Sequence, residues 1–420
     1  MVRPSILAFL TPALCHALPL APLAACGSPA DPDLVAERRL PAAVAADVQA
    51  VSRANNQFAL DLLGVLPSAG NQFFSPFSIS TALWMLDAGA AGDTDAELRA
   101  ALHATLPGAQ AHQAYGAMLD SLEVGRSFDL YTLATANRLF GQQGFTFLQP
   151  YLDLTADAYG APLAPVDFQN ATAALAEING WVSDRTDAKI PALLDEVAPD
   201  TALVLVNAIV FKGRWVREFE RDRTGLSPFT LASGEQVDVT MMAKDDDVAL
   251  VSLEGGRLGV LPFRGRDLSM MVLVPDQPRG LPTLEAALTA ESLAAAIAAA
   301  DAQLADGERD TLVMLPKFAF EAELALPEAL QALGIVSAFD PDRADLSGID
   351  GTRQLSVQKA VHKAVILVDE AGAEAAAATA IGVGPTSAPP ELVVDRPFVF
   401  FIYDHVTGSI LFLGRVNDPR

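Results

Sequence analysis

The hydrophobic positions of this chain follow two periods, helical in the first half and strand-like in the second. Between about Ala43 and Leu66, apolar residues such as Phe58 and Leu62 recur at helical spacing, which predicts a helix. Later, short apolar runs are separated by Gly-containing turns, which predicts strands. Helices early and strands late predict an α+β fold.

The other predicted elements follow the same two patterns. The segment Asn71 to Ala88 begins with a Ser75-Pro76 turn and continues as a predicted apolar helix. Further helices are predicted at Thr94 to Ala101, Pro107 to Glu123, Thr172 to Val182 and Leu284 to Ala305. Strands are predicted at Phe128 to Leu139, Leu203 to Phe211, Val248 to Leu253, Leu258 to Phe263, Ser269 to Val274, Thr311 to Pro316, Val357 to Asp369, Leu392 to Val394, Phe398 to Asp404 and Ser409 to Arg415. Thr94 and Glu97 have the spacing of a capping box. The run from Leu203 to Phe211 is nearly all β-branched or apolar, which predicts a strand buried on both faces.

Composition places these elements in one large folded body. The chain has 420 residues, of which 51% are hydrophobic and 19% charged, so a sizeable core is available and intrinsic disorder is excluded for most of the chain. No repeat period and no clear linker occur beyond Asp33, which predicts a single domain over residues 43–420. The net charge of −24 repels phosphate backbones and argues against a nucleic-acid partner.

The sequence gives little support for an enzyme. The cysteines are Cys15 and Cys26, so the body can hold neither a disulfide nor a thiolate metal site. The sequence has no Gly-x-Ser-x-Gly elbow, Walker loop or His-Glu-x-x-His motif, and we interpret Asp245-Asp246-Asp247 as a solvated turn rather than a cation site. We therefore expect no catalytic residue, no metal and no cofactor. A hydrolase with an unrecognised site is the alternative.

The first 25 residues have the features of a secretory signal. Arg3 precedes a segment rich in Leu, Ala and Pro, and Leu23-Ala24-Ala25-Cys26 resembles the bacterial lipoprotein box, in which the cysteine becomes the lipidated first residue. Residues 26–42 then predict a flexible, Pro-rich tether. The protein is thus expected to be exported and held at the bacterial cell envelope by a lipid on Cys26, its sole membrane contact. The alternative is ordinary cleavage, which leaves Cys26 as a free thiol in a secreted protein.

The segment from Glu370 to Glu391 carries the strongest functional signal. It joins two predicted strands over about twenty residues, which is longer than the usual ordered connection. No basic and no aromatic residue occurs between Lys363 and Arg396. Read at period two, the first half presents one apolar face and one face of small residues with the single charge of Glu374. Such a loop can become a strand in the middle of a sheet; a flexible Ala/Gly/Pro linker with accidental alternation is the alternative.

A series of short motifs from about Asn55 to Pro419 points to one family. The motifs are Asn71-Gln-Phe-Phe-Ser-Pro-Phe-Ser-Ile-Ser80, Gly89-Ala-Ala-Gly92, Ala136-Asn-Arg-Leu-Phe140, Ile178-Asn-Gly-Trp-Val182 with Lys189-Ile190, Leu205-Val-Asn-Ala-Ile-Val-Phe-Lys-Gly-Arg-Trp215, Asp267-Leu-Ser-Met270, Leu315-Pro-Lys-Phe318, Ala344-Asp-Leu-Ser-Gly348, Ala360-Val-His-Lys-Ala364, Arg396-Pro-Phe-Val-Phe-Phe401 and Leu411-Phe-Leu-Gly-Arg415. Their order makes them very specific: the chain resembles the serpins, of a bacterial, inhibitory type. The resemblance implies helices packed on a large, mostly antiparallel central sheet, two further sheets and an exposed reactive loop.

The resemblance also implies a mechanism. A serpin presents its reactive loop, in this chain about residues 370–391, as bait to a serine protease, in some members a cysteine protease. At the acyl-enzyme stage the cut loop inserts into the large sheet and distorts the trapped protease. The bait reacts but does not catalyse, so the resemblance implies that the protein is not an enzyme. Its partner is then the target protease in a covalent complex, and the protein is expected to be a monomer.

The family's functional positions can be carried over residue by residue. Family spacing from the hinge glutamate places the scissile bond at Thr386-Ser387. The residues that match the loop hinge and the part that inserts first are Glu370, Gly372, Ala373, Glu374, Ala375, Ala376, Ala377 and Ala378. Small hinge residues favour an inhibitory member, although Ala373 stands where Thr or Ser is commoner. Four polar residues match the shutter beneath the sheet, and Trp215 matches the breach where the loop enters; the four are Ser75, Ser78, Asn207 and His362.

The bait residues limit the class of target protease. Trypsin-like proteases require Arg or Lys and chymotrypsin-like ones an aromatic residue, and the loop contains neither. Thr386, or Val383 in a different register, suits the shallow pocket of an elastase-like or subtilisin-like protease. The alternative within the fold is a non-inhibitory serpin that acts as a carrier or surface-binding protein and is cut without trapping the protease.

Overall fold

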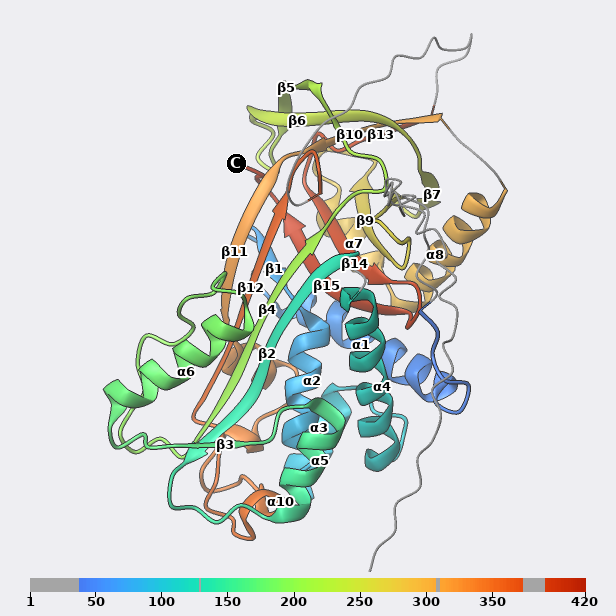
Figure 1. Cartoon of the computed structure of the whole chain (residues 1–420). Helices are drawn as coiled ribbons and strands as arrows, with labels where there is room; N and C mark the ends of the chain where they lie inside the picture. The colour runs from blue at the N-terminus through green and yellow to red at the C-terminus, as the bar shows by residue number, and fades with distance from the viewer. Residues whose placement is uncertain (1–37, 128–129, 307–309, 373–389) are drawn as a thin grey trace, which may run out of the picture.

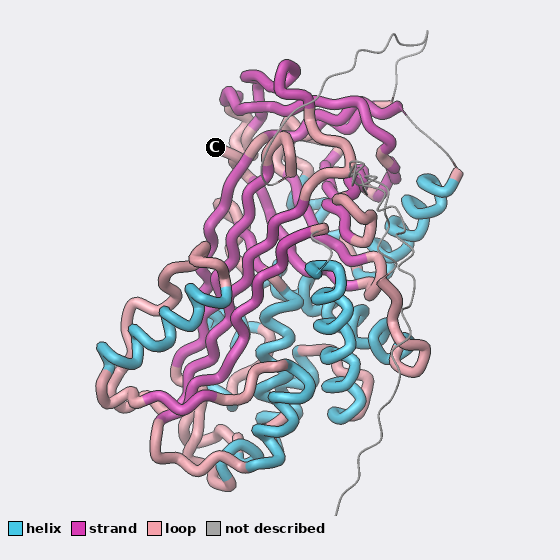
Figure 2. The backbone as a smooth tube through the Cα atoms, in the orientation of Figure 1, coloured by secondary structure: helices cyan, strands magenta, loops and turns pink. Residues whose placement is uncertain are grey.

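The computed structural model describes residues 38–127, 130–306, 310–372 and 390–420 (Figure 1). Its strands form sheets of five, six and four strands, and most helices gather beside and below them (Figure 2). The α+β architecture with one large sheet and two further sheets is therefore confirmed. The loop residues Ala373 to Ala378, Thr386 and Ser387, and the amino-terminal Cys26, lie outside the described residues.

The helices run through the chain as follows: α1 (Ala45–Val65), α2 (Pro76–Asp87), α3 (Gly92–Ala101), α4 (Gly108–Ser127), α5 (Gln149–Tyr159), α6 (Ala171–Arg185), α7 (Leu281–Ala287), α8 (Ala290–Ala305), α9 (Leu326–Ala332) and α10 (Ser347–Asp350), with a 3-10 turn η1 at Ser337–Phe339. α2 is buried along its whole length and contacts β2 and β4 of the five-stranded sheet. Such burial is typical of a helix whose apolar residues are spread around its whole circumference rather than along one side. It places the amino end of α2 beneath the sheet.

The order of the strands across each sheet differs from their order in the chain. The five-stranded sheet contains, from edge to edge, β11 (Phe318–Ala325), β12 (Lys359–Val368), β4 (Leu203–Gly213), β2 (Tyr131–Gln142) and β3 (Ala164–Val166). The six-stranded sheet contains β1 (Gln72–Phe74), β15 (Ser409–Val416), β14 (Phe398–Asp404), β9 (Leu268–Pro275), β8 (Gly256–Pro262) and β7 (Ala249–Leu253). The four-stranded sheet contains β13 (Glu391–Val393), β10 (Asp310–Pro316), β6 (Gln236–Asp247) and β5 (Glu220–Thr230).

The centre of the five-stranded sheet is a parallel pair, β12 and β4. We call this pairing the seam; its register runs from Lys359 opposite Val204 to Val365 opposite Val210. The long outer pairings, β11 with β12 and β2 with β4, are antiparallel. β4 is buried from Leu203 to Phe211, as its largely apolar sequence, broken only by Asn207, predicted.

Two helix predictions need correction. The predicted capping box at Thr94 is wrong: α3 begins at Gly92, and Thr94 Oγ1 accepts a hydrogen bond from the Asp345 N–H at 2.9 Å. The single helix predicted at Leu284 to Ala305 is also wrong. It is two helices, α7 and α8, bent by 97°, because Thr289 caps the second one in a capping box with Ser292. No single described helix has the length and apolar character to cross a membrane, although this bent pair passes on those two criteria when taken together.

The first described residue, Arg38, is buried. Its Nη1 and Nη2 donate to the Asp404 carboxylate at 3.0 Å each, and its Nε donates to the Ser121 carbonyl oxygen at 2.7 Å. Asp404, at the end of β14, is fully buried, and a second carboxylate oxygen, Asp267 Oδ2, lies 3.8 Å from Nη1. Residues 38–42, which the sequence assigned to the tether, therefore begin with an arginine fixed inside the body.

Candidate functional site

A four-residue turn lies at the carboxyl ends of β12 and β4. We call Asp369–Gly372 the hinge turn; a bridge joins its first and last residues. Three consecutive carbonyl oxygens of the turn accept hydrogen bonds. Trp215 donates its indole Nε1–H to Asp369 at 3.0 Å and its backbone N–H to Ala371 at 3.2 Å, and the Phe219 N–H donates to Glu370 at 2.8 Å. The predicted hinge residues Glu370 and Gly372 thus lie against Trp215, the predicted breach residue.

Trp215 is itself firmly placed. It is fully buried, and its ring stacks on Phe263 with the ring centres 4.6 Å apart and an interplanar angle of 12°. Its ring also meets the edge of Phe219 at 5.9 Å. A buried, stacked indole has little freedom to move, so the hinge turn is hydrogen-bonded to a rigid group.

Gly372 is required by the shape of the turn. Its φ is +106°, in the region that residues with a side chain rarely adopt. A Cβ at this position would overlap the Gly213 carbonyl oxygen and would lie only 2.8 Å from the Arg214 Cα and the Trp215 nitrogen. All three obstacles are backbone atoms, which cannot rotate away as a flexible side chain would.

Replacing Gly372 by Ala is expected to dislodge the hinge turn. About 3 kcal/mol should be lost, from roughly three hydrogen bonds at about 1 kcal/mol each, and amide exchange at Trp215 and Phe219 should accelerate. Gly255 is a matched control, because its φ is +79° but no atom lies within 4 Å of a built Cβ. Equal effects of Gly372→Ala and Gly255→Ala on the thermal midpoint and on this exchange would contradict the assignment.

A salt bridge holds the hinge turn from the other side. Lys317 Nζ, in the connection between β10 and β11, lies 2.9 Å from Glu370 Oε2. Burial acts to raise the pKa of Glu370, but the hydrogen bond and the positive charge of Lys317, together with hydrogen bonds from the Glu370 backbone and the Thr224 side chain, outweigh burial, and the pKa is lowered. The carboxylate is therefore kept charged. Lys317 was missed as a site residue, although it lies inside the motif Leu315-Pro-Lys-Phe318.

The four predicted shutter residues come together beneath the seam. Asn207 of β4 lies opposite His362 of β12 in the sheet register, and Ser75 and Ser78 lie at the amino end of α2, where the Ser75 hydroxyl accepts from the Ser78 N–H at 3.0 Å. The Asn207 amide donates to the Ser78 carbonyl at 2.6 Å and to the Ser78 hydroxyl oxygen at 2.9 Å. The network therefore ties both seam strands to the helix below them.

Asn137 of β2 is a fifth member of this network. Its Oδ1 accepts from the Ser78 hydroxyl at 2.9 Å and from the Asn207 amide at 2.8 Å. It lies opposite Asn207 in the register of β2 and β4, so the polar row crosses three strands. Sequence reasoning missed Asn137, although the motif Ala136-Asn-Arg-Leu-Phe140 contained it.

The hydrogen bonds of His362 define its tautomer. The Ser75 N–H donates to Nε2 at 3.0 Å, so Nε2 is an acceptor and the proton lies on Nδ1, which faces Asn207 Oδ1. His362 is fully buried, and burial lowers its pKa to about 3. A second proton would have to enter at Nε2, where a backbone donor already points.

His362 is expected to make the folded state sensitive to acid. Its pKa is about 3 in the folded protein and about 6.5 in the unfolded chain. As the pH falls between these values, the unfolded state binds a proton that the folded state does not. Stability is then fully present above pH ~6.5 and is lost progressively on acidification, by about 2 kcal/mol at pH ~5. Thermal midpoints measured across this range should fall less steeply for His362→Gln; parallel curves would exclude this origin.

Away from the hinge turn, the described residues give little support for a metal or ligand site. Within the described ranges no group of three or more His, Cys, Asp or Glu side chains could hold a metal ion. The interpretation of Asp245-Asp246-Asp247 as a solvated turn is wrong. These residues end strand β6, Asp246 is buried beside Lys244, and Asp245 pairs with Arg223 at 2.8 Å.

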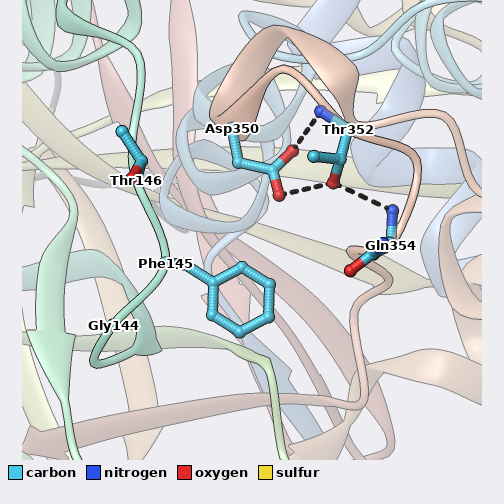
Figure 3. A pocket seen from close by; sticks show the side chains of 6 residues that line it. All are labelled: Gly144, Phe145, Thr146, Asp350, Thr352 and Gln354. Carbon is cyan, nitrogen blue, oxygen red and sulfur yellow. Dashed lines mark hydrogen bonds between the residues drawn. The ribbon is translucent and has the colours of Figure 1, made fainter.

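A pocket of about 290 Å³ lies between the connection after β2 and the loop after α10 (Figure 3). It lies near the end of β2 far from the hinge turn. Its carboxylate, Asp350, already accepts from the Thr352 N–H at 2.8 Å and from the Thr352 hydroxyl at 2.7 Å. The pocket therefore offers little unsatisfied chemistry.

Comparison with known proteins identifies the family to which this chain is similar. A family model described as "Serpin (serine protease inhibitor)" matches residues 53–419. The chain is 40% identical over 386 residues to the leukocyte elastase inhibitor of Bos taurus, with 89% of this chain and 100% of that protein covered.

Solved structures show the same likeness. The mouse protein-Z dependent protease inhibitor superposes with a TM-score of 0.80 at 26% identity, over 90% of this chain and 99% of that one. Uncleaved ovalbumin superposes with a TM-score of 0.78 at 31% identity, over 88% and 100%. The cattle and mouse relatives are eukaryotic, so the bacterial origin expected from the sequence stays a prediction.

Proposed function

The chain belongs to the serpin family, and on that premise we propose that it inhibits serine proteases as a suicide substrate. The protease's serine oxygen attacks the Thr386 carbonyl carbon, the Thr386-Ser387 bond breaks, and the Ser387 nitrogen leaves with a proton from the protease's general acid. Thr386 stays bound to the protease as an ester. The cut loop then enters the seam before water hydrolyses the ester.

The seam is the observation that carries this proposal. The hinge turn follows β12 directly, so a strand that continued from the turn between β12 and β4 would run antiparallel to β12. Because β4 is parallel to β12, the same strand would also run antiparallel to β4. Insertion would replace one parallel pairing by two antiparallel ones, which are somewhat more stable per residue. The inserted strand would form backbone hydrogen bonds with β12 on one side and with β4 on the other.

The proposed target class is a protease with a shallow primary pocket. The loop offers Thr386 and no Arg, Lys or aromatic residue, which suits an elastase-like or subtilisin-like enzyme. The relative at 40% identity is named as an inhibitor of leukocyte elastase, which favours the elastase-like class.

The expectation that the protein is simply not an enzyme needs correction. The relatives are named as protease inhibitors, and a serpin inhibitor is formally a suicide substrate whose own peptide bond reacts. The chain is therefore a reactant in the protease's acyl-transfer step, and a plain division into enzyme and non-enzyme does not describe it.

Incubation with pancreatic elastase and with subtilisin tests the proposal. A covalent adduct that survives denaturing electrophoresis, together with a carboxyl-terminal fragment that starts at Ser387 in mass spectrometry, is the expected result. Thr386→Arg is the matched variant, because it should form the adduct with trypsin instead. Complete cleavage at Thr386-Ser387 without an adduct for either protease would contradict an inhibitory function.

We also propose that the protein is exported and anchored by a lipid on Cys26. The support is the signal-like segment and the Leu23-Ala24-Ala25-Cys26 box. Detergent extraction of membranes from a bacterial host, followed by mass spectrometry of the mature amino terminus, should find a lipidated Cys26. Cys26→Ser should move the protein to the soluble fraction, and an unmodified terminus in the wild-type protein would refute the anchor.

A further inference from the structure

Lys244, on β6, is a lysine buried to 1% exposure, which is rare for this residue type. Its Nζ lies 2.6 Å from Asp246 Oδ2 and donates to the Arg217 carbonyl oxygen at 2.6 Å. The same ammonium lies 4.6 Å from the ring centre of Phe219 and 5.3 Å from that of Trp215. Both distances are within the range of cation–π attraction.

These two rings belong to the residues that hold the hinge turn. The backbone N–H groups of Trp215 and Phe219 donate to Ala371 and Glu370, and Arg217 lies between them in the chain. Lys244 therefore contacts the segment 215–219 at three points, two rings and one carbonyl oxygen. It reaches this segment from the four-stranded sheet, so it joins that sheet to the end of the seam.

Packing alone does not account for a lysine at this position. Burying an ammonium costs free energy that an apolar side chain of similar length would not cost. The charge is offset by Asp246 and by the electron-rich faces of the two rings. Beyond the packing that any side chain of this size would provide, the charge adds an electrostatic attraction to Trp215 and Phe219, the residues that donate hydrogen bonds to the hinge turn.

We propose that Lys244 is a positioning residue that holds segment 215–219 over the hinge turn and so delays loop entry until the bait is cut. The role in inhibition rests on the function proposed above. Residues 369–371 stay hydrogen-bonded while the segment stays in place, because Lys244 fixes the rings that carry the donors. Loss of the charge loosens the segment and lowers the barrier to premature insertion of the uncut loop into the seam.

Amide hydrogen exchange tests this role without any protease. In Lys244→Met, exchange at the Trp215 and Phe219 amides should be roughly tenfold faster, which corresponds to about 1.4 kcal/mol, while amides of β14 and β15 should keep their wild-type rates. Lys244→Arg keeps the charge and should restore slow exchange. Lys363→Met is the matched control, because Lys363 also has a carboxylate partner, Glu321, at 2.8 Å. The cation–π contacts with Trp215 and Phe219 are made by Lys244, so Lys363→Met should leave the exchange rates of these two amides unchanged.

A second readout measures the consequence for inhibition. Uncut Lys244→Met should lose its capacity to form the elastase adduct roughly tenfold faster on warming, whereas the rate of adduct formation by fresh protein should equal that of the wild type. If Lys244→Met does not fold, Phe219→Leu removes one ring without changing the charge and should speed exchange at Trp215.

The two proposals fail in different ways. Wild-type exchange at Trp215 and Phe219 in Lys244→Met, or an equal acceleration in all three sheets, would overturn the positioning role. A wild-type protein that forms no adduct would overturn the proposed function, and the exchange experiment would still decide whether Lys244 holds the hinge turn.

Discussion

A protein cut in its loop is expected to unfold about 10 °C or more above the intact protein. On the proposed mechanism, the cut frees the segment after the hinge turn, which then pairs as a new strand with both β12 and β4. Roughly ten additional hydrogen bonds at about 1 kcal/mol each give about 10 kcal/mol. At about 2 cal/mol/K of unfolding entropy per residue, this corresponds to a rise of ~10 °C for a chain of this size.

Differential scanning calorimetry before and after limited cleavage measures this rise. Ala377→Pro is the matched control, because a proline in the middle of the entering strand cannot donate to the ladder. This variant should be cut equally well and should keep the midpoint of its uncut form. A wild-type midpoint that is unchanged or lower after cleavage would exclude insertion.

The second large effect is expected at the amino-terminal end of the body. Arg38→Ala removes the guanidinium from the buried Asp404 carboxylate and leaves Asp267 beside it without that cation. Breaking a buried ion pair in this way costs about 3–5 kcal/mol, because one charge stays buried without its partner. The free energy of unfolding should fall by that amount.

Arg53, on the exposed side of α1, provides the control for Arg38. Its side chain faces solvent, so Arg53→Ala should change the free energy of unfolding by no more than about 0.5 kcal/mol. Urea titrations of both variants measure the difference. Equal small losses for the two variants would show that the Arg38 ion pair contributes no net stability.

Much of the fold could be predicted because its central elements are strongly apolar. β4 and β14 are predominantly apolar, and their positions were predicted within a few residues. β5 and β11 were missed because most of their residues are exposed or only partly buried. The first half of β5 is rich in charged residues, and β11 carries Glu321 and Glu323 on its exposed side. Their strand conformation comes from sheet neighbours rather than from local pattern.

The candidate site was only partly accessible from sequence. His362, Asn207 and Gly372 could be placed because each lies in a motif or at a fixed distance from one. Arg38 and Lys244 could not, because their significance depends on partners that only the fold brings near. The Arg38 partner Asp404 is 366 residues away in the chain. The rings beside Lys244 are those of Trp215 and Phe219, which lie in the connection between β4 and β5.

The buried position of Arg38 sets where a shortened version of this protein can begin. The family match starts at residue 53 and α1 starts at Ala45, so a fragment cut by either criterion would omit the arginine. A fragment that begins at Ala45 would keep every described helix and strand but would leave the Asp404 carboxylate without its guanidinium partner. Truncation up to residue 37 leaves the ion pair intact, so Arg38 is the last residue at which a shortened chain can begin and still keep it.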